Sequence, residues 1–224
     1  MRPISSSLLA ILVLFVGHAC GQTVTTNASP ATNPEPPALN AGAERNWSAS
    51  ASVYQYLVPD DRDYAQPTVT FDREWLHLEA RYNYEDLHTG SAWVGYNFSG
   101  GKKLAWEITP MLGGVFGDTD GIAPGYRGSL SWWKLELDSE GEYVFDTGES
   151  SASFFYNWSE LTLAPVDWFR FGMVTQRTRV YQTGSDIQRG PLVGFSVKRI
   201  DLTTYVLYPN EGKPTVVLAV TLKF

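Results

Sequence analysis

The stretch that decides the fold class is residues 75–85, which read WLHLEARYNYE. Apolar and polar side chains alternate along it with a period of two, and this period sorts them onto the two faces of a β-strand. One face carries Leu76, Leu78, Ala80, Tyr82 and Tyr84, and the other carries His77, Glu79, Arg81, Asn83 and Glu85. The stretch therefore predicts a strand with one apolar and one polar surface.

The same alternation recurs on the C-terminal side of this stretch. Residues 91–99 and 103–112 repeat it around a turn at Gly100 and Gly101, although Trp93 falls on the polar side. Because proline cannot donate a hydrogen bond to a sheet, we expect a β-bulge at Pro110. Further candidate strands are 46–58, 125–137, 140–145, 151–163, 168–181, 189–198, 200–208 and 215–224.

These candidates number eleven, and a meander of this length avoids exposed edges most simply by closing into a barrel. Bacterial outer-membrane barrels have even strand numbers. Either 125–145 is a single strand bent near Gly141, which gives ten strands, or one strand is missed by the pattern, which gives twelve. The predicted fold class is all-β, an antiparallel up-and-down transmembrane β-barrel of about 10–12 strands over residues 46–224.

Composition agrees with this fold class and excludes one class of partner. The 224 residues are 43% apolar and 14% aromatic, with 20 Gly and 13 Pro, which favours strands and turns over helices. The formal net charge is −7, and no basic block is present. Because a nucleic-acid-binding surface needs clustered Lys and Arg, we expect no nucleic-acid partner.

The first 45 residues have the composition of an export signal followed by a linker. Arg2 precedes an apolar run at 4–16, so residues 1–21 are predicted to be a cleaved signal peptide. A competing interpretation is that Cys20, the single cysteine, carries a bacterial lipid anchor. Residues 22–45 hold almost no bulky apolar side chain, and this composition predicts a disordered linker.

The alternation alone leaves open whether the apolar face points into the barrel or towards lipid. The last strand favours lipid, because it ends in an aromatic residue with apolar residues at alternate positions before it. This arrangement resembles the C-terminal signal that the outer-membrane barrel assembly machinery engages. The predicted assembly signal is Val216, Leu218, Val220, Leu222 and Phe224.

Two further features favour the same orientation. Aromatic pairs near strand ends suit girdles at the two lipid boundaries, and long polar side chains on the other face suit a crowded lumen. The aromatic pairs are Tyr54 with Tyr56, Tyr82 with Tyr84, Trp132 with Trp133, Trp168 with Phe169, and Tyr205 with Tyr208. The predicted lumen network is His77, Glu79, Arg81, Glu85, Glu107, Arg170 and Gln176.

Three blocks carry a resemblance to a known family: residues 75–85, the segment 154–161 (FFYNWSEL) and the segment 176–179 (QRTR). Together with the terminal strand, they resemble an uncharacterised family of small bacterial outer-membrane β-barrel proteins. The resemblance covers most of residues 46–224. It implies a fold and a location only, and it assigns no catalytic residue.

The polar face leaves several functions open. We expect a structural or binding component of the outer membrane with a largely filled lumen, and a narrow, porin-like channel for small solutes is the main alternative. An outer-membrane lipid-modifying enzyme and a soluble extracellular ligand-binding barrel are further alternatives. The mature chain holds only His77 and His88 as candidate bases, so no catalytic residue, metal or cofactor is predicted. The expected partners are outer-membrane lipids and the barrel assembly machinery.

Overall fold

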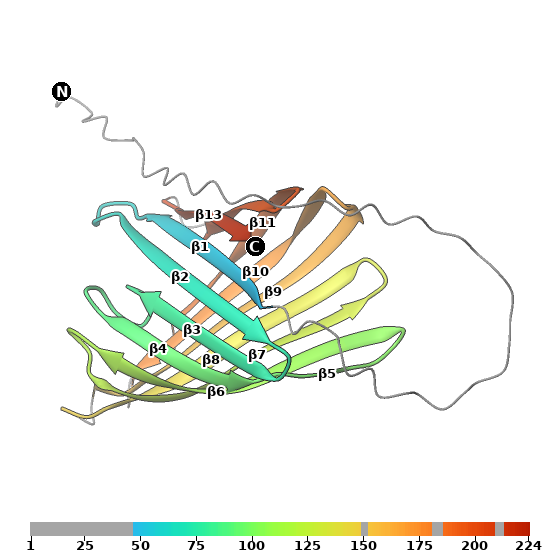
Figure 1. The fold of residues 1–224 in the computed structure, drawn as a ribbon. Coiled ribbons are helices and arrows are strands. Elements are labelled where there is room, and N and C mark those ends of the chain that lie inside the picture. Colours follow the sequence, from blue (N-terminus) through green and yellow to red (C-terminus); the bar gives the residue numbers. More distant parts are fainter. Residues whose placement is uncertain (1–46, 149–151, 181–185, 209–212) are drawn as a thin grey trace, which may run out of the picture. The chain divides into compact units, whose positions relative to one another are not determined.

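The computed structural model describes residues 47–148, 152–180, 186–208 and 213–224 (Figure 1). The predicted signal peptide at 1–21, the predicted linker at 22–45 and Cys20 lie outside the described residues. In the described ranges, no helix is long and apolar enough to cross a membrane.

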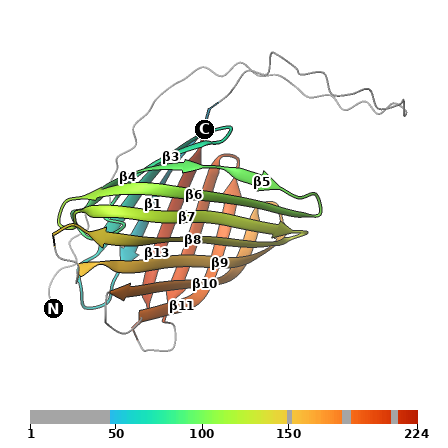
Figure 2. The ribbon, with the colours of Figure 1, turned by 90° about the horizontal axis from the view of Figure 1, so that it is seen from below.

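Antiparallel strands make up the fold, and they follow one another round the sheet in chain order. The strands are β1 (Ser48–Leu57), β2 (Tyr64–Arg73), β3 (Leu76–Tyr82), β4 (Gly90–Tyr96), β5 (Phe98–Gly100), β6 (Leu104–Phe116), β7 (Gly121–Trp132), β8 (Leu135–Asp146), β9 (Phe154–Val166), β10 (Phe169–Val180), β11 (Asp186–Val197), β12 (Ile200–Leu207) and β13 (Thr215–Lys223). Strands β6–β11 lie side by side in Figure 2.

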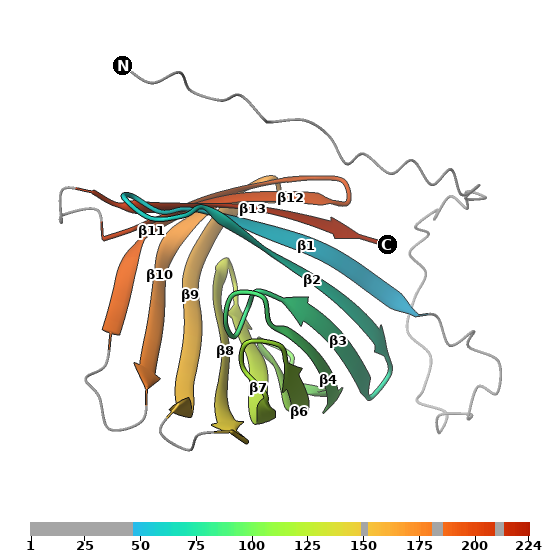
Figure 3. The same cartoon turned by 90° about the vertical axis from the view of Figure 1, so that its left-hand side faces the viewer.

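The sheet closes on itself into a barrel. Strand β13 pairs with β1, and β4 pairs with both β3 and β6. The three-residue β5 follows β4 after Asn97 and pairs with the same neighbour, so β4 and β5 are two parts of one strand of the ring. The closed ring therefore has twelve strands, which confirms the up-and-down barrel and the higher of the two predicted numbers. Figure 3 looks along it, with β12, β13 and β1 on one side and β6–β9 opposite.

The predicted strands differ from the observed ones in two places. The pattern missed β2, which contains Pro67, and only β1 pairs with that proline because the β2–β3 register ends at Thr68 opposite Arg81. The pattern also placed a break between residues 137 and 140, whereas β7 and β8 are joined at Trp133 and Lys134. This turn contains no Gly, Pro, Asn or Asp, and Trp133 itself adopts a positive φ of 56°.

The bulge predicted at Pro110 is also wrong. The β6–β7 register runs without a shift from Leu104 to Val115, with Pro110 opposite Tyr126. The interruption falls instead on the other neighbour of β6, where the pairing lapses between Gly95 and Phe98 and separates β4 from β5. Because Pro110 lies opposite this gap and has no N–H to donate, it accounts for the interruption without an extra residue.

The apolar face of the sheet points outwards, as the terminal strand predicts. Leu112 is 52% exposed and Leu218 42% exposed, whereas Glu79 and Arg81 are each only 6% exposed. Of the predicted assembly signal, Leu218, Val220, Leu222 and Phe224 are exposed and Val216 is half-buried. Recognition of this strand by the assembly machinery stays a prediction.

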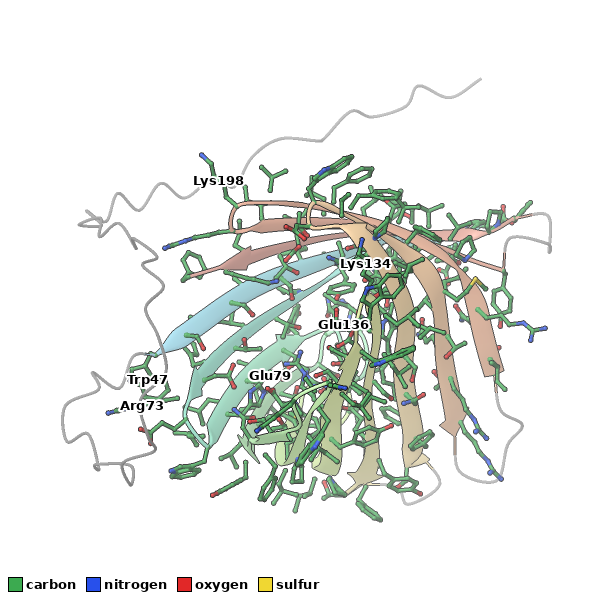
Figure 4. The ribbon with its side chains drawn as sticks, turned by 90° about the vertical axis from the view of Figure 1, so that its right-hand side faces the viewer. Trp47, Arg73, Glu79, Lys134, Glu136 and Lys198 are labelled. Atoms are coloured by element: carbon green, nitrogen blue, oxygen red, sulfur yellow. The ribbon has the colours of Figure 1, made fainter. Side chains whose placement is uncertain are left out.

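The two ends of the barrel differ in their connections. Five short turns, after β2, β5, β7, β9 and β11, lie at the end where the first and last described residues also lie. We call this the turn end, and the opposite end the loop end, because longer connections such as residues 58–63 and 83–89 lie there. Figure 3 faces the loop end and Figure 4 faces the turn end.

One group of polar side chains interrupts the apolar exterior on β7, β8 and β9. Asn157 Nδ2 donates to Tyr126 Oη at 3.0 Å and to the carbonyl oxygen of Glu140 at 2.8 Å, and the hydroxyls of Ser139 and Ser159 lie 2.9 Å apart. These groups form hydrogen bonds with one another, and the hydrogen bonds offset much of the free-energy cost of placing polar atoms on an apolar surface.

Candidate functional site: buried side chains of the lumen and a vestibule

A set of buried, inward-facing side chains lies in one part of the lumen. Each of the twelve strands of the ring contributes an inward-facing residue that is no more than 8% exposed, at the middle of the strand or nearer the loop end. These residues are Tyr56, Gln66, Arg81, Trp93, Val115, Ala123, Val144, Tyr156, Val174, Leu192, Leu207 and Val217. These twelve inward side chains are shielded from water. We call this region the plug.

Aromatic rings fill much of the plug. Tyr54 stacks on Tyr205 with 6.1 Å between ring centroids, Trp158 meets Tyr205 edge-on at 5.2 Å, and Tyr56 stacks on Tyr64 at 4.7 Å. The girdle prediction is therefore wrong for the tyrosines that point into the barrel. They are Tyr54, Tyr56, Tyr84 and Tyr205. Tyr82, Trp132 and Trp168 point outwards and are exposed, as a girdle requires, and their place at a lipid boundary stays a prediction.

Trp93, which broke the polar side of its predicted strand, is a central part of the plug. Its indole ring lies across the adjacent strand at Gly113, where an added Cβ would come within 2.4 Å of the ring. Its Nε1 donates to Ser91 Oγ at 2.9 Å. Only a glycine at position 113 leaves room for the indole, so this pair of residues fits together as a unit.

Arg81 is the main buried cation of the plug. Its Nε donates to Glu79 Oε1 at 2.6 Å and its Nη1 donates to Glu142 Oε2 at 2.8 Å. The guanidinium also lies over the rings of Tyr84 at 4.2 Å and Trp93 at 4.7 Å. With its side chain only 2% exposed, Arg81 joins the charged and aromatic parts of the plug.

From Glu79 the charged network continues towards the turn end. Glu79 Oε2 lies 3.2 Å from Arg127 Nη1 and 3.0 Å from His77 Nε2. His77 Nδ1 lies 2.7 Å from Asp72 Oδ1. The imidazole is thus held between two carboxylates, which orient it and satisfy both ring nitrogens.

Glu85 and Tyr84 lie in the loop after β3, on the loop-end side of this charged network. Ser91 Oγ donates to Glu85 Oε1 at 2.5 Å, Arg81 Nη1 lies 3.9 Å from the same oxygen, and Glu85 Oε2 is buried without a hydrogen bond. Burial raises the pKa of the Glu85 carboxyl above its usual value. Burial, followed by the charge of Glu140, raises the pKa of the Tyr84 hydroxyl well above its usual value, so it stays protonated and donates to Glu140.

Between the plug and the turn end lies a polar cavity of about 480 Å³, which we call the vestibule. Its wall carries more carboxylates than cations. The carboxylates are Asp72, Glu107, Glu136, Asp138, Glu140, Glu160 and Asp201, and the cations are Arg127, Arg170 and Lys223, beside His77. Glu79 and Glu136 are labelled in Figure 4, which faces this end of the barrel.

The structure joins some of the predicted network residues and separates others. His77, Glu79, Arg81 and Glu85 form one connected group. Arg170 belongs to a second group, in which its Nη1 lies 3.3 Å from Asp201 Oδ1 and its Nη2 donates to Thr203 Oγ1 at 2.7 Å. Glu107 lines the vestibule, and Gln176 has a buried Oε1 without a hydrogen bond.

Both candidate bases bond to carboxylates. His88, in the loop after β3, lies 3.1 Å from Asp118 and is exposed, while His77 is held by Asp72 and Glu79. Among the described residues, no group of three or more His, Cys, Asp or Glu side chains is arranged to hold a metal ion. The described geometry is that of a charge network beside a polar cavity.

The aromatic part of the plug was missed in the sequence, although the signal was present. Tyr54 and Tyr56 alternate in phase with Ser50 and Ser52, the polar side of β1, while the apolar Val53 occupies the other phase. Strict attention to phase would therefore have placed these rings inside the barrel.

Comparison with solved structures supports the architecture. The KdgM porin aligns with a TM-score of 0.55 and 10% identity, over 78% of this chain and 99% of the porin. The chain shares the fold of bacterial outer-membrane β-barrels. Omp33 of Acinetobacter baumannii aligns with a TM-score of 0.47 and 8% identity, over 80% of this chain and 97% of Omp33. No protein-family model and no curated protein matches the chain.

Proposed function

We propose that this protein is an outer-membrane barrel that does not conduct freely and that binds a small polar solute in its vestibule. Three features support the membrane location: an apolar exterior, an even-numbered closed ring, and short turns at the end where β1 begins and β13 ends. Under this proposal the vestibule opens to the periplasm, because short turns face that compartment in such barrels.

The observation that carries the closed-lumen part of the proposal is the ring of twelve inward residues at 8% exposure or less. The plug combines ring stacking with an ion-paired Arg81, and both kinds of contact are strong in a site shielded from water. A solute that enters the vestibule meets carboxylates and guanidinium groups at its wall, and these supply polar contacts.

Planar bilayers test the proposal. Purified protein should give no stable single-channel steps, whereas the triple variant Trp93→Ala, Trp158→Ala and Tyr205→Ala should conduct because it removes three large rings from the plug. Retained heat-modifiable gel mobility serves as the control that each protein is folded. Stable steps from the unaltered protein would overturn the closed-lumen proposal.

The narrow channel is the second candidate. It is favoured by the vestibule, which opens part of the lumen, and by the fold shared with the KdgM porin. This candidate requires the plug to move. Conductance by the unaltered protein, abolished by a disulfide that fixes the plug to the barrel wall, would support it.

Export by a cleaved signal at residues 1–21 and insertion through the terminal strand belong to the same proposal. The exposed outward row Leu218, Val220 and Leu222 on β13 supports the second part of this proposal. Lipidation of Cys20 is the alternative at the N-terminus, and the mass of the mature chain distinguishes the two.

A further inference from the structure

The five turns at the turn end carry an excess of positive charge, in contrast to the carboxylate-rich wall of the vestibule that they surround. In and beside these turns lie six cations, with Glu74 and Asp167 as the only carboxylates. The cations are Arg73, Lys102, Lys103, Lys134, Lys198 and Arg199. Figure 4 shows Arg73, Lys134 and Lys198 at separate positions around this end. We call these six residues the basic rim.

The exposed tryptophans of the chain gather at the same end. Of the eight Trp residues, Trp93 and Trp158 are buried in the plug. The other six are between 42% and 78% exposed, and all lie in or near the turns: Trp47, Trp75, Trp106, Trp132, Trp133 and Trp168. Indole rings favour the headgroup region of a bilayer, so this end is matched to a membrane boundary.

Cations and indoles lie next to each other on the rim. Lys134 Nζ is 5.7 Å from the centre of the Trp133 ring, and the Arg73 guanidinium is 5.5 Å from that of Trp47. Lys134 also donates to the carbonyl oxygen of Pro165. Two of the six cations thus sit at the level of exposed aromatic rings, where headgroup phosphates would lie.

The loop end has the opposite charge. Its described connections carry six exposed carboxylates, Asp60, Asp61, Asp63, Asp86, Asp118 and Asp120, against Arg62 and Lys213. A surface of negative lipid phosphates would therefore be attracted to one end of the barrel and repelled from the other.

We propose that the basic rim binds anionic phospholipid headgroups of the leaflet at the turn end. The basic rim has cations at four of the five turns. The exposed indoles beside them would lie in the headgroup region of the same leaflet. This binding would fix the depth and the direction of the barrel in the membrane. The proposal rests on the proposed membrane location.

Quenching of tryptophan fluorescence by brominated lipids measures this binding directly, because the exposed indoles all lie at the rim. The folded protein is placed in phosphatidylcholine vesicles containing phosphatidylglycerol, and either lipid carries the bromine. We expect a relative association constant for phosphatidylglycerol about fivefold above that for phosphatidylcholine, falling towards one in about 1 M salt.

Two variants make the test specific. Replacing all six rim cations by Gln should bring the ratio close to one, while the matched variant Arg62→Gln with Lys213→Gln at the loop end should leave it unchanged. An unaltered ratio in the six-residue variant, or equal binding of both lipids by the unaltered protein, overturns the proposal. Absence of quenching by either lipid would instead overturn the membrane location itself.

Discussion

Arg81 is the residue on which the buried charges of the plug depend. Glu142 Oε2 has its hydrogen bond from Arg81 at 2.8 Å, and Glu142 Oε1 is buried without one. Arg81→Met would leave this carboxylate without its cation, and loss of one partner from a buried pair costs about 3–5 kcal/mol. Urea unfolding in lipid vesicles should show a loss of that size. Adding Glu142→Gln should restore part of it, and a loss below about 1 kcal/mol would contradict the assignment.

Glu85 gives the plug a dependence on pH. Burial raises its pKa in the folded protein, so the neutral carboxyl stabilises the fold at low pH, and this contribution is lost as the pH rises through the raised pKa. Glu85→Gln keeps an oxygen that accepts from Ser91 and removes the titration. The variant should therefore gain stability relative to the unaltered protein on going from about pH 4 to about pH 8. An equal difference at both pH values would contradict this account.

The interior phase of residues 76–82 was readable from sequence, but the partners of their side chains were not. Beyond β3 the phase was wrong, because Tyr84 lies in a loop and points into the plug. Alternation places His77, Glu79 and Arg81 on one face, whichever strands lie opposite. The contact between Arg81 and Glu142 spans 61 positions and depends on ring closure, which the local pattern does not encode.

At the scale of strands, β4 and β6 fit together through Trp93 and Gly113. An added Cβ at Gly113 would lie 2.4 Å from the indole, whereas the neighbouring Gly114 faces open space. Gly113→Ala should therefore destabilise the barrel by about 1–3 kcal/mol through overpacking, and Gly114→Ala should leave its stability unchanged or slightly raised. Unfolding by urea measures both variants, and equal effects would contradict the packing described.

The strands that the sequence predicted well are those with clean alternation, such as β3 and β13. Strand β2 was missed because a proline usually interrupts a strand. Pro67 is tolerated here because it lies beyond the end of the β2–β3 pairing and has only β1 as a neighbour. The β7–β8 turn was misplaced because Trp133 and Lys134 are not turn-forming residue types. Both errors come from local chemistry that the closed sheet overrides.

At the scale of the molecule, the sequence predicted that the apolar face points outwards. It did not predict that the lumen contains a plug towards the loop end and a vestibule towards the turn end. The terminal alternation of β13 indicated an apolar exterior. The boundary between plug and vestibule depends on which inward residues of twelve strands share a level, and strand tilt and register decide that.

The central claim is that the apolar face of the barrel meets hydrocarbon while the other face lines a polar lumen. Spin labels on single cysteines at Val220 and Thr221, neighbours on β13, test it in a chain without Cys20. Val220 is 42% exposed on the outside, and Thr221 lines the vestibule. In lipid vesicles, the Val220 label should collide with oxygen and be shielded from a water-soluble nickel complex, and the Thr221 label should show the reverse. A Val220 label that the nickel complex reaches freely would contradict the account.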